Sequence, residues 1–159
     1  MEKLVEEALT LFNEKRYHEL IILLNGHENM ENGIIQYIIG SLYNQGIERE
    51  VDYSKAFEHF YKSALAGYPE GERALGIYYY QGYGTIVDEA QGLYWVKKAV
   101  DDGLVRALCT LAHIYMNGMG VPRDEYQAYL LYKEAAEKGD EHAKEHLKEC
   151  IEKGFDKLK

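Results

Sequence analysis

The chain has 159 residues, of which 47% are apolar and 13% aromatic, and it carries a formal net charge of −9 at pH 7. This length allows one domain with a continuous core, and this composition excludes a disordered chain. Because the charge is negative and no basic cluster is present, the chain would repel phosphate groups. We therefore expect neither nucleic acid nor an anionic membrane as a partner.

Residues 2–25 predict a pair of short helices, joined by a polar turn at residues 13–16. Apolar side chains recur in the pair at helical spacing, at Phe12, Tyr17, Leu20, Ile21 and Leu24. The pair resembles a tetratricopeptide hairpin. It does not share the period of the residues that follow, so we interpret residues 1–33 as an N-terminal capping unit of a repeat array.

The first residues, MEKLVEEALTL, are acidic where a secretory signal is basic, and the apolar runs are too short to cross a bilayer. We therefore expect a cytoplasmic protein, with a removed signal peptide as the alternative. The two cysteines, Cys109 and Cys150, are 41 positions apart and out of register on a repeat of 36 residues. We expect both to be free thiols in a reducing compartment.

Residues 34–142 repeat with a period of 36 and no insertions. The matching positions include Gly46, Gly82 and Gly118; Tyr43, Tyr79 and Tyr115; Asp52, Asp88 and Asp124; and Gly67, Gly103 and Gly139. A fixed period of this length predicts stacked supersecondary units, each unable to fold alone.

The predicted fold is an all-α, right-handed superhelical solenoid of antiparallel helix pairs, forming a single domain over residues 1–159. Its units are the cap at 1–33, three repeats at 34–70, 71–106 and 107–142, and a C-terminal capping helix at 143–159. Ala143, Leu147 and Ile151 continue the apolar stripe into that last helix, which ends in a polar tail at residues 157–159.

In the middle repeat, Tyr68 and Pro69 predict the start of a first helix, because proline is tolerated at the first helical position. Gly82 ends that helix by adopting a left-handed conformation. A second helix begins at Asp88, whose carboxylate caps the first turn, and Gln91 would complete a capping box.

Small residues on both helices of this repeat predict a close approach of their backbones. Gly76 on the first helix would lie against Gly92 on the second. We expect Leu75, Tyr79 and Trp95 to fill the volume around this crossing as core residues.

The middle repeat therefore reads LG, a tyrosine, a glycine pair, an aspartate, and then an alanine and a glycine, and the other two largely share this pattern. This pattern resembles the Sel-one-like repeat, a relative of the tetratricopeptide repeat, over residues 34 to about 151. The first repeat departs from it at Glu48, which stands where Gly84 and Gly120 stand in the others. The resemblance implies an adaptor or scaffold that binds proteins.

The repeat pattern leaves one set of first-helix positions undetermined, at spacings of four and three residues. In chain order these positions are Tyr37, Ser41 and Asn44; Arg73, Ile77 and Tyr80; Cys109, His113 and Met116; and then Glu145 and Glu149, followed by Glu152. We call them the first-helix strip. First helices line the concave surface of a stacked array, so the strip is our predicted partner-binding site. Unconstrained solvent positions would vary between copies in the same way.

Two constellations suggest catalysis, and we reject both. His142, Glu145 and His146 match an H-x-x-E-H metal motif, but they lie on the predicted cap with no third ligand in the sequence. Cys109 and His113 are four residues apart, but no acid is placed to orient the histidine. We expect no enzyme, no cofactor and no metal.

The function that we predict is a non-enzymatic protein-protein interaction module. Its net charge favours a protein partner with a basic surface. The alternative is a stoichiometric inhibitor, such as a bacterial immunity protein that neutralises a toxin. The sequence does not indicate the oligomeric state.

Overall fold

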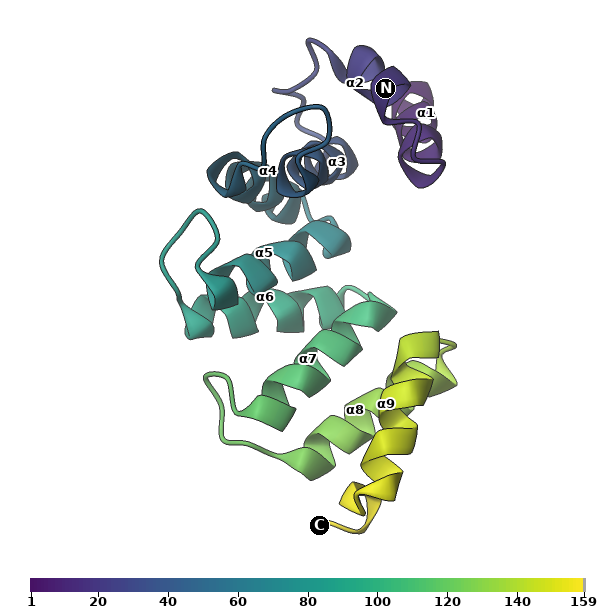
Figure 1. The fold of residues 1–159 in the computed structure, drawn as a ribbon, viewed down its shortest axis with the longest axis vertical. Helices are drawn as coiled ribbons and strands as arrows, with labels where there is room; N and C mark the ends of the chain where they lie inside the picture. Colours follow the sequence, from purple (N-terminus) through teal and green to yellow (C-terminus); the bar gives the residue numbers. More distant parts are fainter. Residues whose placement is uncertain (159) are drawn as a thin grey trace.

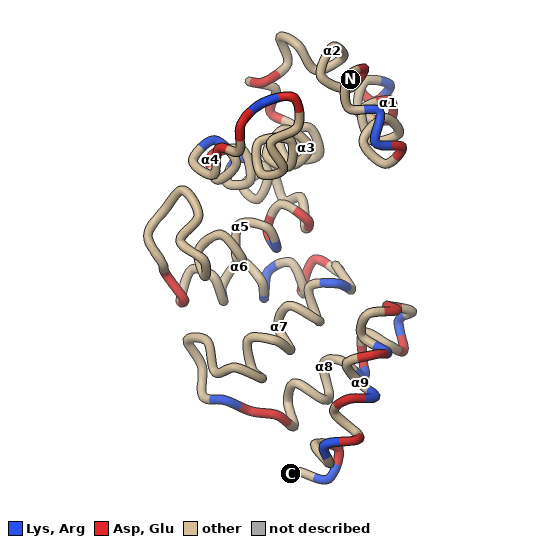
Figure 2. The backbone as a smooth tube through the Cα atoms, in the orientation of Figure 1, with Lys and Arg blue, Asp and Glu red and all other residues tan. Residues whose placement is uncertain are grey.

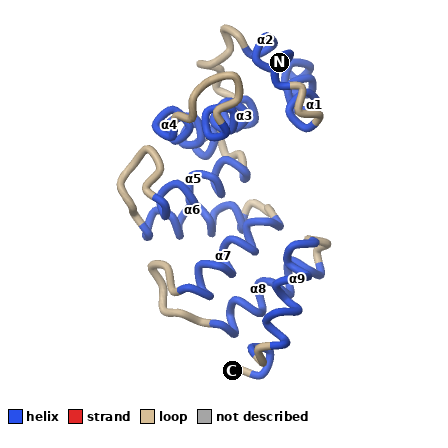
Figure 3. Tube along the Cα trace, viewed as in Figure 1, coloured by secondary structure: helices blue, strands red, loops and turns tan. Residues whose placement is uncertain are grey.

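The computed structural model describes residues 1–158, and all regular structure within them is helical (Figure 3). The helices are α1 Glu2–Asn13, α2 Tyr17–Leu24, α3 Gly33–Gln45, α4 Tyr53–Leu65, α5 Pro69–Gln81, α6 Glu89–Asp101, α7 Val105–Asn117, α8 Glu125–Glu137, α9 Glu141–Glu152 and the 3-10 helix η1 Phe155–Lys157. They stack in chain order, with the two termini at opposite ends of the long axis (Figure 1). The predicted all-α solenoid is confirmed.

The 36-residue period is the period of the helices. The first helices α3, α5, α7 and α9 begin at positions 33, 69, 105 and 141, and the second helices α4, α6 and α8 begin at 53, 89 and 125. The first helices therefore begin two residues before the predicted repeat borders at 71 and 107. The cause is visible at α5, where Tyr68 is the N-cap and Pro69 takes the first helical position, as the sequence predicts.

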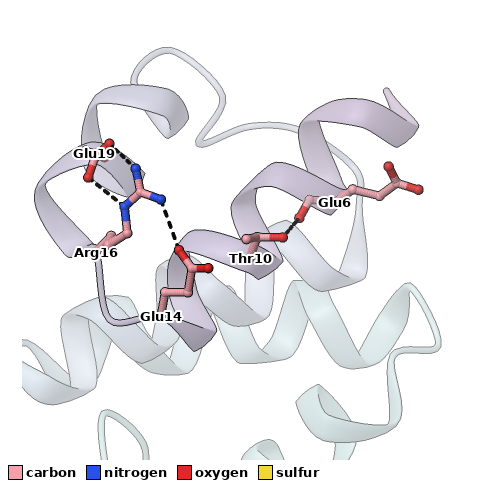
Figure 4. A network of polar contacts seen from close by, with 5 residues as sticks. All are labelled: Glu6, Thr10, Glu14, Arg16 and Glu19. Atoms are coloured by element: carbon pink, nitrogen blue, oxygen red, sulfur yellow. Dashed lines mark hydrogen bonds and ion pairs between the residues drawn. The ribbon is translucent and has the colours of Figure 1, made fainter.

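The N-terminal pair forms as predicted, and Leu20 and Leu24 are buried in it. Arg16 orders the turn between α1 and α2 (Figure 4). Its guanidinium donates to Glu19 at 2.8 and 2.6 Å and to Glu14 at 3.0 Å. At the other end, η1 follows α9 where we predicted only a polar tail, and Lys159 lies outside the described residues.

The second helices begin with the predicted aspartate caps. The side chain of Asp88 accepts from the Gln91 backbone N–H at 2.9 Å, and Asp124 repeats this contact with Gln127 at 2.8 Å. The predicted capping box is wrong in its second half. The Asp88 backbone N–H already donates to the Tyr79 carbonyl at 2.9 Å, so the Gln91 side chain has no group left to satisfy.

The close crossing of α5 and α6 is confirmed. A Cβ atom at Gly76 would lie 2.9 Å from the Gly92 carbonyl oxygen, and one at Gly92 would lie 2.6 Å from the Tyr80 ring. Of the predicted core residues, Leu75 and Trp95 are buried, whereas Tyr79 is only half-buried. Tyr80 and Val96, rather than Tyr79, occupy the space beside the glycines.

The core consists of three clusters distributed along the stack. Helix α5 contributes to two of them, because Tyr78 faces the preceding repeat and Tyr80 faces the following one. Both side chains are buried, whereas Tyr79 is only half-buried. A helix inside a solenoid packs against both the preceding and the following repeat. More of its surface is therefore buried than the regular spacing of glycines and tyrosines in the repeat predicts.

Candidate protein-binding groove

The part of the first-helix strip on α3 is occupied by contacts within the chain. The Ser41 hydroxyl donates to the Tyr37 carbonyl at 2.8 Å, and Asn44 accepts from the Tyr78 hydroxyl at 2.7 Å. The Tyr37 ring lies edge-on to Tyr68, with centroids 5.5 Å apart. Ser41 is buried, and the side-chain oxygen of Asn44 already accepts a hydrogen bond within the chain, so these two positions are poorly placed to contact a partner.

Tyr80, on α5, is also a core residue. It is 8% exposed, and its hydroxyl donates to the Met119 carbonyl at 3.3 Å. Burial raises its pKa to about 12. The reason is Gly92, which has no side chain and leaves space on α6 that the Tyr80 ring fills. The side chain is therefore almost fully covered by the protein.

The middle of the strip opens onto a pocket of about 350 Å³. Ile77 and Tyr80 of α5 and Cys109 and His113 of α7 line it, so the structure brings four predicted positions together. The remaining lining residues are Gln81, Thr110, Ile114, Met119, Tyr132 and His146.

A second pocket of about 210 Å³ adjoins the first. Both are lined by His113, Tyr132 and His146, and the His146 ring stacks on Tyr132 with centroids 4.8 Å apart. The second pocket adds Met116, Asn117, Glu149, Cys150, Lys153 and Phe155. Because they share a wall, we treat the two pockets as one feature and call it the α5–α9 groove.

The groove is nearly uncharged at neutral pH. Burial, reinforced by the carboxylate of Asp140, raises the pKa of the Cys109 thiol to about 11. Burial raises the pKa of Tyr132 to about 12. The charged side chains of the lining, Glu149 and Lys153, pair with each other at 2.7 Å. Such a surface suits apolar and neutral polar groups of a partner.

Besides the three positions on α3, two further predicted site residues, Arg73 and Glu145, lie outside the groove lining. Arg73 is mostly covered, and its Nε lies 3.5 Å from the Glu70 carboxylate, which also faces Arg106 at 3.5 Å. Glu145 is exposed on α9 but lines neither pocket.

The geometry around the candidate catalytic residues does not resemble an active site. A thiol whose pKa is raised gives little thiolate, and the His113 ring lies within 3.3 Å of the Asn117 amide nitrogen. His142, Glu145 and His146 are exposed on α9, and among residues 1–158 no group of three or more His, Cys, Asp or Glu side chains could hold a metal ion. Both cysteines are free.

Comparison with known families identifies the repeat. The family model described as Sel1 repeat matches residues 36–68, 69–104 and 105–140, which correspond to the helix pairs α3–α4, α5–α6 and α7–α8. The chain belongs to the Sel1 repeat family. Sel1 repeat proteins mediate protein-protein interactions, and the fold is typically non-enzymatic.

Solved Sel1 repeat structures share this fold. A Sel1 repeat protein from Oxalobacter formigenes is 29% identical, with a TM-score of 0.77 over 90% of this chain and 58% of that one. A protective antigen of uropathogenic Escherichia coli is 25% identical, with a TM-score of 0.76 over 91% of this chain and 32% of that one.

Two curated relatives are much longer than this chain. A chitin synthase regulator of Malassezia restricta is 25% identical over an alignment of 150 positions, which covers 87% of this chain and 10% of that protein. An uncharacterized protein of Neisseria meningitidis is 26% identical over 133 residues, which are 84% of this chain and 27% of that protein. Within residues 1–158, none of the Sel1 helices has the length and apolar character of a membrane span.

Sequence reasoning missed several residues of the groove in this Sel1 array. Tyr132 lies on a second helix, at the position that Val96 and Phe60 occupy in the preceding repeats. The hydroxyl of a tyrosine at a core position needs a hydrogen-bond partner or contact with water. The tyrosine at position 132 was therefore the available signal that this part of the core borders an opening. His146 was considered only as part of a metal motif. Phe155 follows Gly154, which lies 36 residues after Gly118 and repeats its left-handed conformation, but the predicted repeats ended before it.

Proposed function

We propose that this chain is a protein-binding module that takes an apolar segment of a partner into the α5–α9 groove, on the concave side of the solenoid. The observation that carries the proposal is the continuity of the two pockets. They join Ile77, Cys109, His113 and Met116 from two successive repeats into one lining that is nearly free of net charge.

The chemistry of the lining supports this proposal. Aromatic and sulfur-containing side chains are enriched at protein interfaces, and Tyr132, Met116 and Met119 are of this kind. The negative charge of the whole chain would attract a partner whose surface around the bound segment is basic.

A role as an adaptor is the form of this function that we favour. One relative is named as a regulator of chitin synthase, and a regulator can act by binding alone. The alternative role, a stoichiometric inhibitor such as an immunity protein, would use the same groove against one partner. Capture of several partners favours the adaptor, whereas one tight partner at a one-to-one ratio favours the inhibitor.

The experiment is affinity capture with matched variants, at low and high salt. The groove variant combines Ile77→Ala and His113→Ala, and the control combines Lys97→Ala and Asp101→Ala, two exposed positions on α6. We expect the groove variant to lose the partner and the control to keep it, with weaker capture at high salt if the partner is basic. Loss of capture in the control alone would overturn the proposal.

A further inference from the structure

A second apolar surface lies on the edge of the solenoid where the loops join first helices to second helices. The α5–α6 loop exposes Tyr83, Ile86 and Val87, and Ile86 is 81% exposed. Val51 and Tyr53, before and at the start of α4, are also exposed. We call these five residues the loop-edge patch.

The patch is particular to the middle of the chain. The positions equivalent to Ile86 hold Glu50 in the first repeat and Pro122 in the third, and a position equivalent to Val87 holds Arg123. Figure 2 shows the α5–α6 loop without charge up to the acidic start of α6, whereas the other two loops carry charged residues. The loop of the middle repeat is therefore the apolar one.

The structure holds this loop in a fixed shape. The Tyr83 ring stacks on Tyr53, with centroids 4.5 Å apart and planes at 11°. The Tyr83 backbone N–H donates to Tyr78 at 3.1 Å, and Gly84 packs so closely that a Cβ there would lie 2.4 Å from the Tyr53 carbonyl oxygen. A preorganised loop loses little conformational entropy on binding, so the exposed apolar area is available for affinity.

Carboxylates outnumber cations around the patch. The acidic residues are Glu48, Glu50, Asp52, Asp88 and Glu89, and the basic ones are Arg49 and Lys55. Both cations are engaged, since Arg49 lies 4.4 Å from the centre of the Tyr43 ring and Lys55 lies 3.9 Å from Asp52. The apolar centre therefore has a rim of net negative charge.

We propose that the loop-edge patch is a second docking surface, separate from the α5–α9 groove, and that it binds a protein segment whose apolar side chains are flanked by lysine or arginine. An apolar centre inside a charged rim is the usual organisation of a protein interface. The acidic rim selects a basic segment. A second copy of this chain is the wrong occupant, because two acidic rims would then face each other.

The test is an amide chemical-shift titration of the whole chain with three synthetic peptides. The first holds two leucines between pairs of lysines, the second replaces the lysines with glutamates, and the third replaces the leucines with serines. We expect saturable shifts at residues 50–53 and 83–89 with the first peptide, and weak or no shifts with the other two.

Two matched variants complete the test. Ile86→Ser removes the most exposed side chain of the patch and should weaken binding of the lysine–leucine peptide about tenfold. Ile22→Ser removes a side chain of the same type that is 64% exposed on α2, and should leave binding unchanged. Equal binding of the glutamate peptide, shifts confined to the groove, or no shifts at all would overturn the proposal. Since the groove variants of the previous section do not alter the patch, each proposal can fail alone.

Discussion

Tyr80 fills the space beside Gly92, and this contact makes it a core residue rather than an anchor for a partner. The side chain on the previous turn, Ile77, is half-buried and reaches the groove. Tyr80 stabilises the fold, whereas Ile77, three positions earlier on the same helix, is suited to binding. The sequence analysis placed both in the first-helix strip, because helical spacing does not show which residue is packed against a glycine of the neighbouring helix.

The variant Tyr80→Ala should lower the free energy of unfolding by about 3 kcal/mol, because it removes a buried aromatic ring and leaves a cavity. Ile77→Ala should lower it by about 1 kcal/mol, since part of that side chain is already in water. Urea unfolding followed by the fluorescence of Trp95, the one tryptophan in the sequence, measures both. A urea midpoint of Tyr80→Ala equal to that of the wild type would show that Tyr80 does not belong to the core.

Glu72 is fully buried on α5, and the Nζ of Lys98 lies 2.7 Å from its carboxylate and 2.7 Å from Asp102. Burial raises the pKa of Glu72 above its ordinary value of 4.5. At pH values between 4.5 and the raised pKa of the folded state, Glu72 is protonated in more folded molecules than unfolded ones, so the folded state binds more protons. The contribution of Glu72 to stability therefore falls as pH rises through its folded pKa, and Lys98 offsets this loss.

The variant Lys98→Ala should therefore cost about 2 kcal/mol or more at pH 7, where it leaves the carboxylate buried without its cation. The cost should shrink as the pH falls toward 4.5 and Glu72 becomes protonated. Unfolding curves of variant and wild type at both pH values give the difference. An equal cost at the two pH values would mean that the ion pair does not neutralise Glu72.

At the scale of the helix and the loop, local chemistry sets the boundaries, and this is why they could be predicted. Pro69 begins α5, Gly82 ends it in a left-handed conformation with φ of 69°, and Asp88 caps α6. How each helix rotates about its axis depends on contacts with two neighbouring helices. The sequence therefore located the Gly76–Gly92 crossing and the buried Leu75 and Trp95, but not Tyr80 and Val96, which lie against the two glycines.

The first loop shows that the repeat conformation persists without its second glycine. Glu48 adopts φ of 52°, next to values of 67° for Gly84 and 68° for Gly120. A non-glycine residue in this region costs roughly 1–2 kcal/mol. The stacked helices hold the loop in this conformation although its sequence disfavours it.

Glu48→Gly should accordingly raise the free energy of unfolding by about 1 kcal/mol, because glycine removes the backbone strain. The greater conformational entropy of glycine in the unfolded chain should offset part of this gain. The matched variant Gly84→Ala should lower it, because the new Cβ would lie 2.4 Å from the Tyr53 carbonyl oxygen. Thermal unfolding of the two variants should shift in opposite directions. A destabilised Glu48→Gly would indicate that the contact of Glu48 with His18, at 3.2 Å, outweighs the backbone strain.

At the scale of the whole molecule, the groove results from the way α9 lies against α8 after the third repeat. His146 of α9 stacks on Tyr132 of α8, and η1 brings Phe155 to the same opening. Helix α9 begins 36 residues after α7, so the period of the helices extends to this wall, although the predicted repeats stop at residue 142. The sequence analysis predicted the solenoid and six residues of the groove lining, Ile77, Tyr80, Cys109, His113, Met116 and Glu149, but not Tyr132, His146 and Phe155.

Hydrogen–deuterium exchange of the chain alone and in complex with its captured partner tests the central claim most directly. If the partner occupies the α5–α9 groove, exchange should slow in residues 73–81, 109–117 and 145–153 and remain unchanged in the second helices α4 and α6. Protection confined to α4 and α6, or to the loop residues 83–89, with none in α5, α7 and α9, would contradict the proposed groove.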